Sequence, residues 1–290
     1  MGLMLKLRFQ NMLSLRRTIN TASVGGSTLL KVEQINGLRK ITMSDTKTRN
    51  ALSMQMMDEL ISNIERNQSD ERLRSIMITS VPGPVFSAGH NLKELTSNKG
   101  IDQQRAIFAK CNQLMITIRK SEVPVFAVVY GLAAAAGCQL VAACDFAIAT
   151  EKAKFSTPGA NFGVFCSTPG ISVARSVNRS LAAYMVLTGL PLNSQEALQA
   201  GLVSKVFPED TIEDSVQQIH NSIRSKSRSI IKLGKEFFYK QIEMGYEEAL
   251  KEGAEVMVQN LQYQDSQEGL DSFKEKRKPV WSHTDDKVKM

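Results

Sequence analysis

The sequence GLAAAAGCQLVAACD, residues 131–145, can be a membrane span, a core helix or the floor of an active site. It lies in an uncharged run, 123–144, whose 22 residues are long enough to cross a bilayer as a helix. Such a helix would have to contain Pro124, a β-branched stretch and Gly131, and it would lack an interfacial aromatic belt. A strand over 123–130, a tight turn at Gly131 and a buried helix fit better, so no transmembrane segment is expected.

The composition of the 290 residues is that of a soluble globular protein, with 42% hydrophobic and 22% charged residues. The net charge of +7 raises the question of nucleic-acid binding. Four of the cations lie in residues 1–30, which contain no acid, so only about +3 remains for the rest of the chain. No basic run interleaved with aromatic residues occurs outside the extreme C-terminus, and nucleic acid is therefore not an expected partner.

Residues 1–28 have the composition of a mitochondrial transit peptide. Leucine and methionine are mixed with four basic residues, serine and threonine are frequent, and acids are absent, which permits an amphipathic basic helix. A secretory signal fits less well because arginines interrupt any apolar core. A basic tail that carries no address is the remaining alternative. We expect the mature protein to lie in the mitochondrial matrix.

The cysteines and histidines do not form a pattern that predicts a metal site or a disulfide framework. The four cysteines contain no CxxC pair, and three of them lie in apolar surroundings, which is typical of reduced, buried thiols. His90, His220 and His283 are far apart in the sequence, and only His90 is expected in the core. No metal is expected.

Hydrophobic periodicity and turn signals divide the chain into strands and helices. The turn at Asn36-Gly37 predicts a hairpin, and Leu52, Met56, Leu60 and Ile64 have helical spacing. Strands are also expected at 74–80, 123–130 and 146–150, and helices from Leu92, over 102–120, after Gly131, and over 194–200, 210–225, 230–241, 247–260 and 267–276.

Two segments, 74–95 and 123–144, share the order strand, glycine-bearing loop, helix. Repeated units of this kind in one domain predict stacked sheets with helices outside them, in an α/β arrangement. The last part of the sequence is almost entirely helical. We therefore expect a core over 29–225 and a C-terminal helical lobe over 226–290, in addition to the leader.

The loops SAGHN (87–91) and GLAAAAG (131–137) each lie between a strand and a helix. Backbone N–H groups at a helix N-terminus are unpaired and lie at the positive end of the dipole, so two such loops could hold one oxyanion. The alternative is that small residues merely permit close packing of helix and sheet.

Several of these segments resemble the signatures of the enoyl-CoA hydratase/isomerase family, the crotonase superfamily. FSAGHNLKEL (86–95) is similar to its first signature, and YGLAAAAGCQLVAACDFAIAT (130–150) is similar to its second, usually NGxAxGGGxELAxxCDxxxA. KTRNALSMQMMDEL, AKFSTPGANFGVFCSTPG, SQEALQAGLVSKVFP and EGLDSFKEKRKP resemble its further landmarks, in the expected order. The resemblance implies a crotonase-like spiral of ββα repeats with a C-terminal helical trimerisation lobe, a homotrimer or dimer of trimers, and a CoA thioester as ligand without a further cofactor.

The resemblance also implies roles for particular residues. The N–H groups of His90 and Ala136 would form an oxyanion hole for the thioester carbonyl, with Ala136 in place of the usual glycine. Phe273 and Lys276 would close over the nucleotide end of CoA, from the same or a neighbouring subunit. Further ligand contacts are expected from Asn50, Ala51, Leu52, Ala88, Lys93, Asn161 and Cys166. For Lys93 and Lys276 a solvated surface lysine is the alternative, and Cys166 is either a buried structural thiol or a nucleophile activated by His90.

Both acids that hydration requires are missing at the matching positions, which hold Gln139 and Gly159. An amide can orient water but cannot act as a general base, and glycine can do neither. Hydration and double-bond isomerisation are therefore expected to be weak or absent. Three functions remain open: oxyanion-hole chemistry such as decarboxylation or thioester hydrolysis, a catalytically silent acyl-CoA sensor or regulator of fatty-acid metabolism, and residual hydration with water held by Gln139.

Overall fold

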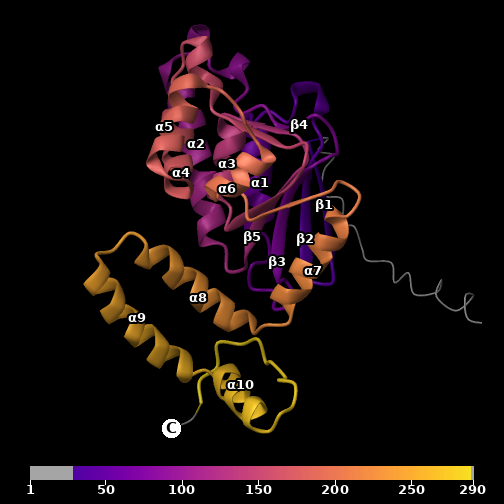
Figure 1. The fold of residues 1–290 in the computed structure, drawn as a ribbon, viewed down its shortest axis with the longest axis vertical. Helices are drawn as coiled ribbons and strands as arrows, with labels where there is room; N and C mark the ends of the chain where they lie inside the picture. Colours follow the sequence, from indigo (N-terminus) through magenta and orange to yellow (C-terminus); the bar gives the residue numbers. More distant parts are fainter. Residues whose placement is uncertain (1–28, 289–290) are drawn as a thin grey trace, which may run out of the picture.

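The computed structural model describes residues 29–288, so the predicted transit peptide lies outside the described residues. Two sheets form the centre of the molecule, and helices cover them (Figure 1). The larger sheet has the spatial order β1 (Leu30–Ile35), β2 (Leu38–Met43), β3 (Ser75–Ser80), β5 (Val125–Val129), β7 (Phe146–Thr150) and β10 (Lys205–Phe207). The smaller sheet has the order β4 (Val85–Ser87), β6 (Leu132–Ala134), β8 (Lys154–Ser156) and β9 (Leu192–Asn193).

The helices alternate with these strands in the core and then follow one another toward the C-terminus. They are α1 (Met54–Glu65), α2 (Ile101–Lys120), α3 (Ala136–Ala143), α4 (Ser167–Ser176), α5 (Arg179–Thr188), α6 (Ser194–Ala200), α7 (Ile212–Arg224), α8 (Arg228–Gln241), α9 (Tyr246–Leu261) and α10 (Gln264–Lys274). Short 3-10 helices occur at η1 (Thr46–Thr48), η2 (Leu92–Glu94), η3 (Ser97–Lys99) and η4 (Pro158–Phe162).

Each repeat places its first strand in the large sheet and its second strand in the small sheet. The pairs β3 and β4, β5 and β6, and β7 and β8 follow this rule, and neighbouring repeats pair in parallel in both sheets. Every residue of β5 is buried, as expected for a parallel strand covered on both faces. The bend occurs at Gly131, where a Cβ would lie 2.5 Å from the carbonyl oxygen of Gly83 in the preceding repeat. The predicted α/β repeat architecture is thus confirmed.

Several local predictions are also confirmed. Strands β1 and β2 form the predicted hairpin, and its turn consists of Asn36 and Gly37. Their φ angles of 52° and 90° are those of a two-residue turn with positive φ at both positions. Helix α1 begins after Ser53, whose hydroxyl accepts the Met56 N–H, and it buries Met56, Leu60 and Ile64 against the core.

Other local predictions were wrong. Leu52 precedes α1 and forms a bridge with His90. The segment from Leu92 forms only η2 and η3, because the Thr96 hydroxyl donates to the Lys93 carbonyl at 3.3 Å and so gives the backbone a local alternative to a helix. The first part of the alanine run is strand β6, and α3 begins only at Ala136. Helices α4 and α5 were not predicted at all.

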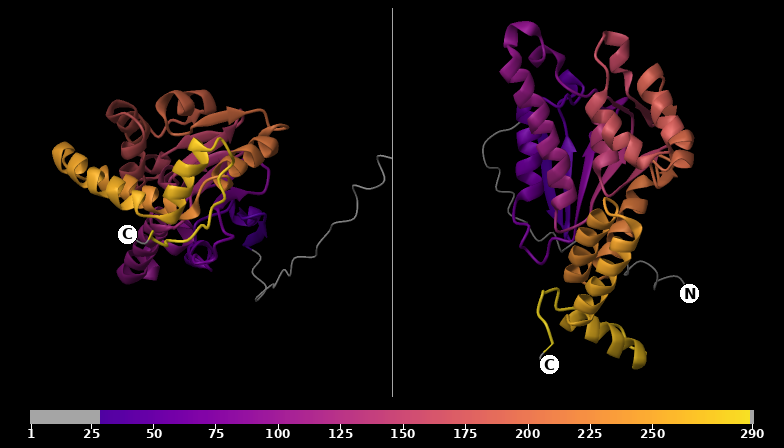
Figure 2. Two further views of the ribbon diagram at one scale, coloured as in Figure 1. Left: turned by 90° about the horizontal axis from the view of Figure 1, so that it is seen from below. Right: turned by 90° about the vertical axis from the view of Figure 1, so that its left-hand side faces the viewer.

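The C-terminal helices α8, α9 and α10 extend from one end of the sheet-containing core (Figures 1 and 2). Helix α9 buries none of its residues within the chain, and its Leu250, Met257 and Val258 are exposed. The helical structure of α8, α9 and α10 was predicted. The division into a core and a lobe, and a role of the lobe in trimerisation, remain predictions.

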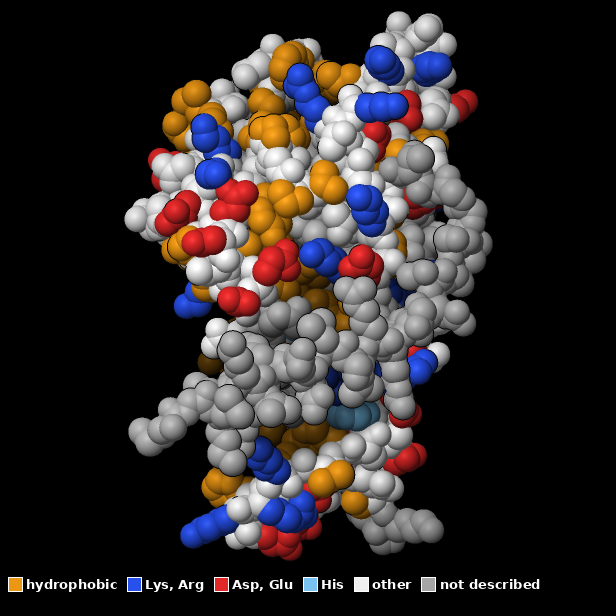
Figure 3. Space-filling view, turned by 90° about the vertical axis from the view of Figure 1, so that its right-hand side faces the viewer, with side chains coloured by type: hydrophobic (Ala, Val, Ile, Leu, Met, Phe, Trp, Pro, Cys, Tyr) orange, Lys and Arg blue, Asp and Glu red, His pale blue; other side chains and the backbone are white. Residues whose placement is uncertain are grey.

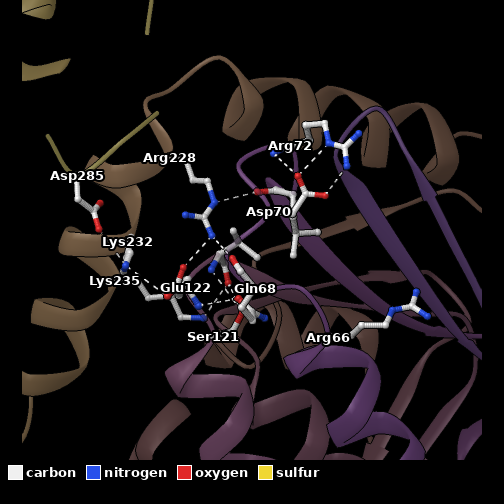
Figure 4. A network of polar contacts seen from close by, with 12 residues as sticks. Arg66, Gln68, Asp70, Arg72, Ser121, Glu122, Arg228, Lys232, Lys235 and Asp285 are labelled. Carbon is white, nitrogen blue, oxygen red and sulfur yellow. Dashed lines mark hydrogen bonds and ion pairs between the residues drawn. The ribbon is translucent and has the colours of Figure 1, made fainter. Parts of the chain in front are cut away.

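Ion pairs attach α8 to the core (Figure 4). The Arg228 guanidinium lies 2.8 Å from Glu122, and the Lys232 ammonium lies 3.3 Å from Glu122 and 3.1 Å from Asp285. Arg228 is buried, so removing the Glu122 carboxylate would leave a poorly solvated guanidinium charge.

A second attachment lies at Asp145, directly after α3. Its carboxylate accepts the Val125 N–H at 2.6 Å and the Tyr239 hydroxyl at 2.7 Å, and it lies 2.8 Å from the Lys235 ammonium. One side chain therefore connects the start of β5, the end of α3 and helix α8.

Basic and acidic side chains are interspersed on the face shown in Figure 3, without a single basic patch. Among residues 29–288, no helix is both long and apolar enough to span a bilayer. Within the same range, His, Cys, Asp and Glu side chains form no group suited to a metal ion.

His220 corrects the expectation that His90 is the only histidine in the core, because its side chain is also buried. The ring nitrogens lie 2.8 Å from the Ser75 hydroxyl and 3.0 Å from the Asn36 carbonyl oxygen. A neutral ring satisfies both partners, accepting from the hydroxyl and donating to the carbonyl. Burial lowers the pKa of His220, and nearby Arg74 and Arg224 lower it further.

We expect acid to destabilise the protein partly through His220. Its folded-state pKa lies below its unfolded value of about 6.5, so the unfolded chain binds the proton more tightly, and stability falls as the pH drops below that value. The free energy of unfolding in urea at pH 7.5 and pH 5.5 measures this loss. His220→Gln should make the decrease in unfolding free energy between pH 7.5 and pH 5.5 smaller. Ser75→Ala keeps the titrating ring and should still show a clear decrease. An unchanged pH dependence in His220→Gln would contradict the assignment.

Candidate functional site

The loops after β4 and β6 are in direct contact at Gly89. A Cβ at this position would lie 2.9 Å from both the Ala134 carbonyl oxygen and the Ala135 Cβ, and 3.1 Å from the Ala136 nitrogen. Only glycine allows this approach, and its φ of 87° also favours glycine. Because β4 and β6 are parallel neighbours, their carboxyl ends meet at one edge of the small sheet. The structure therefore brings His90 and Ala136 close together.

The backbone N–H groups of His90 and Ala136 have no acceptor among the described residues. Ala136 is the first residue of α3, so its N–H has no intrahelical acceptor and lies at the positive end of the helix. The adjacent Gly89 is bonded differently, since its carbonyl accepts the Leu52 N–H at 2.8 Å. Two unpaired donors near one helix N-terminus are suited to an oxygen that carries negative charge.

Ala135, between β6 and α3, has a strained backbone, with φ 49° and ψ −118°. A non-glycine residue in such a region costs about 1–3 kcal/mol, and such strain is concentrated at functional sites. The Ala135 N–H donates to the Ser156 carbonyl at 2.9 Å, so strand β8 helps to hold this conformation.

Asn50, Ala51 and Leu52 lie behind the first loop and are all buried. The Asn50 side chain donates to the Phe86 carbonyl at 3.0 Å, and the Ser87 hydroxyl donates to the Asn50 carbonyl at 2.8 Å. These residues fix the position of the loop that holds His90.

The His90 ring packs edge-on against Phe108, with ring centroids 5.3 Å apart. Burial lowers the pKa of His90, so the ring is neutral at physiological pH. Both ring nitrogens are buried without a hydrogen-bond partner among residues 29–288. No hydrogen bond joins this ring to Cys166 in the described part of the chain, and burial raises the pKa of the Cys166 thiol. These features favour the structural interpretation of Cys166.

Gln139 lies one helical turn after Ala136 and is buried, with 3% of its surface exposed. The Cys111 thiol on α2 donates to its side-chain oxygen Oε1 at a distance of 3.7 Å. Gln139 also lines a cavity of about 750 Å³ between α2, α3, α4 and α8. His90 and Ala136 do not line this cavity, whose lining on α3 is Gln139 and the residues that follow it, 141–143.

Gly159 begins a tight turn that leaves no room for a side chain. Its N–H donates to the Cys166 sulfur at 3.2 Å, and its carbonyl accepts the Val164 N–H at 3.0 Å. A Cβ at position 159 would overlap the Val164 carbonyl oxygen and lie 2.8 Å from the Cys166 sulfur. A glutamate therefore cannot occupy this position unless the turn changes its backbone.

The remaining sequence-predicted residues lie at or beyond the rim of this site. Ala88, Lys93 and Asn161 are exposed. Ala88 directly follows β4, Lys93 lies in η2 and Asn161 lies in η4. Phe273 is 85% exposed near the end of α10, and Lys276 follows it. Figure 1 shows α10 at the opposite end of the molecule from β4, so a single chain does not bring these two residues to the amide pair.

Sequence reasoning missed three features of the site. They are the thiol contact of Cys111, the strained backbone of Ala135 and the buried Thr157 hydroxyl, which has no partner among the described residues. Only Ala135 had a signal in the sequence, since it replaces a second glycine of the signature. The Cys111 contact had none, because it joins residues that are distant in the sequence.

Comparisons with known proteins show the family of the chain and agree with its fold. The family model described as enoyl-CoA hydratase/isomerase matches residues 33–284. The chain therefore belongs to the enoyl-CoA hydratase/isomerase family, and its fold is the crotonase fold of the solved relatives.

Among its relatives is enoyl-CoA hydratase domain-containing protein 3, mitochondrial. The Danio rerio protein is 45% identical over 98% of this chain and 94% of its own length, and the Homo sapiens protein is 49% identical over 86% and 82%. The crystal structure of the human protein covers 87% of this chain and 100% of its own, with a TM-score of 0.85 and 46% identity. An enoyl-CoA hydratase structure from Mycobacterium smegmatis has the same TM-score, covers 89% of this chain and all of its own, and is 36% identical.

We expect Gly159→Ala to destabilise the protein by about 1–3 kcal/mol, because even a methyl group overlaps the Val164 carbonyl oxygen. Gly234→Ala is a matched control. Gly234 lies in helix α8, a Cβ there would have no atom within 4 Å, and the substitution should stabilise by up to about 1 kcal/mol. Urea unfolding measures both changes. An unchanged free energy of unfolding in Gly159→Ala would show that the turn rearranges easily.

Proposed function

We propose that this protein binds acyl-CoA thioesters and polarises the thioester carbonyl with the N–H groups of His90 and Ala136. The observation that carries this proposal is the pair of unpaired amides that the contact at Gly89 brings together. Membership of the enoyl-CoA hydratase/isomerase family supports a CoA thioester as the ligand.

The chemistry that best fits such a site forms an enolate without a protein base. In a malonyl-type thioester, the bond from the α-carbon to the carboxylate breaks and CO₂ leaves. The electron pair of the broken bond stays on the α-carbon and forms the enolate with the thioester carbonyl. The two N–H groups stabilise the enolate oxygen, and a proton from water then completes the product. A site of this kind needs oxyanion donors more than it needs a general base. Thioester hydrolysis is a weaker candidate because Cys166 has a raised pKa.

Efficient hydration of a 2-enoyl-CoA is disfavoured. The reaction needs groups that take a proton from water and return one to the α-carbon. Gln139 cannot do this, and the turn at Gly159 excludes a second side chain. Residual hydration with water held by Gln139 and a catalytically silent acyl-CoA sensor are the alternative functions.

A panel of CoA thioesters, tested with protein that lacks residues 1–28, separates these functions. We expect Ala136→Leu to weaken binding more than about tenfold, or about 1.4 kcal/mol, because Ala136 is fully buried and a longer side chain would displace the start of α3 together with its N–H group. Ala182→Leu, at another buried alanine on α5, is the control for overpacking. Isothermal titration calorimetry measures binding, and release of CO₂, free thiol or hydrated product measures turnover.

Each result has a distinct meaning. Release of CO₂ from a malonyl-type thioester supports the proposed chemistry, whereas tight binding without any turnover indicates a sensor. Hydration at rates typical of enzymes would contradict the argument from the missing acids. Failure to bind any thioester, or equal binding by Ala136→Leu and the parent protein, would exclude the amide pair as the ligand site.

We also propose that the protein acts in the mitochondrial matrix, in acyl-CoA or fatty-acid metabolism. The composition of residues 1–28 and the mitochondrial relatives support this location. A fusion of these residues to a fluorescent protein should enter mitochondria, and a fusion with Arg8, Arg16 and Arg17 replaced by glutamine should not. A diffuse cytosolic signal from the first fusion would contradict a transit peptide.

We further propose a homotrimer or a dimer of trimers, in which Phe273 and Lys276 approach the CoA site of a neighbour. The exposed apolar residues of α9 support an association through the C-terminal helices.

A further inference from the structure

The side-chain amide of Gln139 has a definite orientation, which the chemistry of Cys111 sets. The Cys111 thiol is fully buried, and burial raises its pKa to about 12, so it remains protonated at neutral pH. The S–H group donates to the amide oxygen at the observed distance of 3.7 Å, which leaves the amide N–H₂ group without a partner at Cys111. The oxygen of Gln139 therefore faces Cys111, and the nitrogen faces away from it.

The amide nitrogen of Gln139 has no acceptor among the described residues, and the residue lines the 750 Å³ cavity. Because the oxygen is engaged by Cys111, the group that Gln139 presents to the cavity is a donor. The family signature that this segment resembles has a glutamate at this position. An ionised carboxylate accepts hydrogen bonds and cannot donate them. The hydrogen-bonding polarity of this position is thus reversed.

We propose that Gln139 donates a hydrogen bond to an oxygen on the β-carbon of the bound acyl group, and that Cys111 is the residue that positions it. The ligand class is then acyl-CoA with a β-oxygen acceptor, either a 3-oxoacyl group or the carboxylate of a malonyl-type group. This inference rests on the proposed function, because it assumes that the thioester carbonyl occupies the amide pair.

The spacing along α3 supports the β-carbon as the partner. Gln139 follows Ala136 by three residues, and side chains of a helix incline toward its N-terminus, so the Gln139 side chain is directed toward the end of α3 at which the Ala136 N–H is unpaired. The β-carbon is two bonds from a carbonyl carbon held at Ala136, within reach of a glutamine side chain. The cavity beyond Gln139 leaves space for the rest of the acyl chain.

A donor at this position selects between ligands of almost equal size. An oxygen on the β-carbon loses its hydrogen bonds to water on binding and regains one from Gln139, whereas a methylene leaves the amide nitrogen without a partner. An unsatisfied polar group of this kind weakens the binding of the ligand that leaves it unpaired. A carboxylate in place of the amide would instead repel the oxygen.

Acetoacetyl-CoA and butyryl-CoA are a suitable pair of probes because they differ mainly in the β-oxygen. We expect the protein without residues 1–28 to bind acetoacetyl-CoA about tenfold more tightly in isothermal titration calorimetry. Gln139→Met, which keeps the length but removes the donor, should abolish this ratio while butyryl-CoA still binds. Gln139→Glu should reverse the ratio.

Variants of Cys111 test the positioning role. The measured quantity is the ratio of the affinities for acetoacetyl-CoA and butyryl-CoA, and not the absolute value of either affinity. Cys111→Ala should lower the ratio toward one because the amide is then free to rotate, and Cys111→Ser should retain it because a hydroxyl still donates. A ratio that is unchanged in Cys111→Ala would exclude the positioning role.

The outcomes for the parent protein separate this inference from the function on which it rests. Equal binding of acetoacetyl-CoA and butyryl-CoA would overturn the donor role and leave acyl-CoA binding intact. Failure of both probes to bind would instead overturn the proposed function itself.

Discussion

The close approach of Gly89 to the segment 134–136 is the contact on which the site depends. It joins two successive repeats at the carboxyl ends of β4 and β6, where a side chain on residue 89 would force the two loops apart. The bend at Gly131 and the strained Ala135 both serve this contact, since they turn the chain from the large sheet through β6 into α3. The sheets therefore fix the separation of the two amides through the backbone alone.

The site consequently keeps its backbone donors although its side-chain acids are absent. Backbone N–H groups do not depend on residue type, so His90 and Ala136 can serve as donors with unusual side chains. The residue types at positions 139 and 159 do not alter the backbone N–H groups of His90 and Ala136. The two unpaired N–H groups are suited to an oxygen that carries negative charge, whereas positions 139 and 159 hold no carboxylate that could move protons.

Local signals in the sequence were sufficient where neighbouring residues determine the structure. The hairpin at Asn36-Gly37 and the buried stripe of α1 are of this kind, and so are the C-terminal helices. The alanine run was interpreted as helix because alanine has a high helix propensity, yet pairing with β4 and β8 makes 132–134 a strand. The signature motifs gave His90 and Ala136. The contact between Cys111 and Gln139 could not be predicted, because 28 residues separate them and only the packing of α2 on α3 joins them.

The turn at Gly159 also has an evolutionary consequence. A carboxylate at position 139 is one substitution away, but a carboxylate at position 159 requires a different backbone from Gly159 to Cys166. Point mutations that pass through a clashing intermediate are removed by selection on folding, so this loop restricts the paths to a two-acid site. Position 139 is therefore freer to exchange an amide for a carboxylate than position 159 is to acquire any side chain.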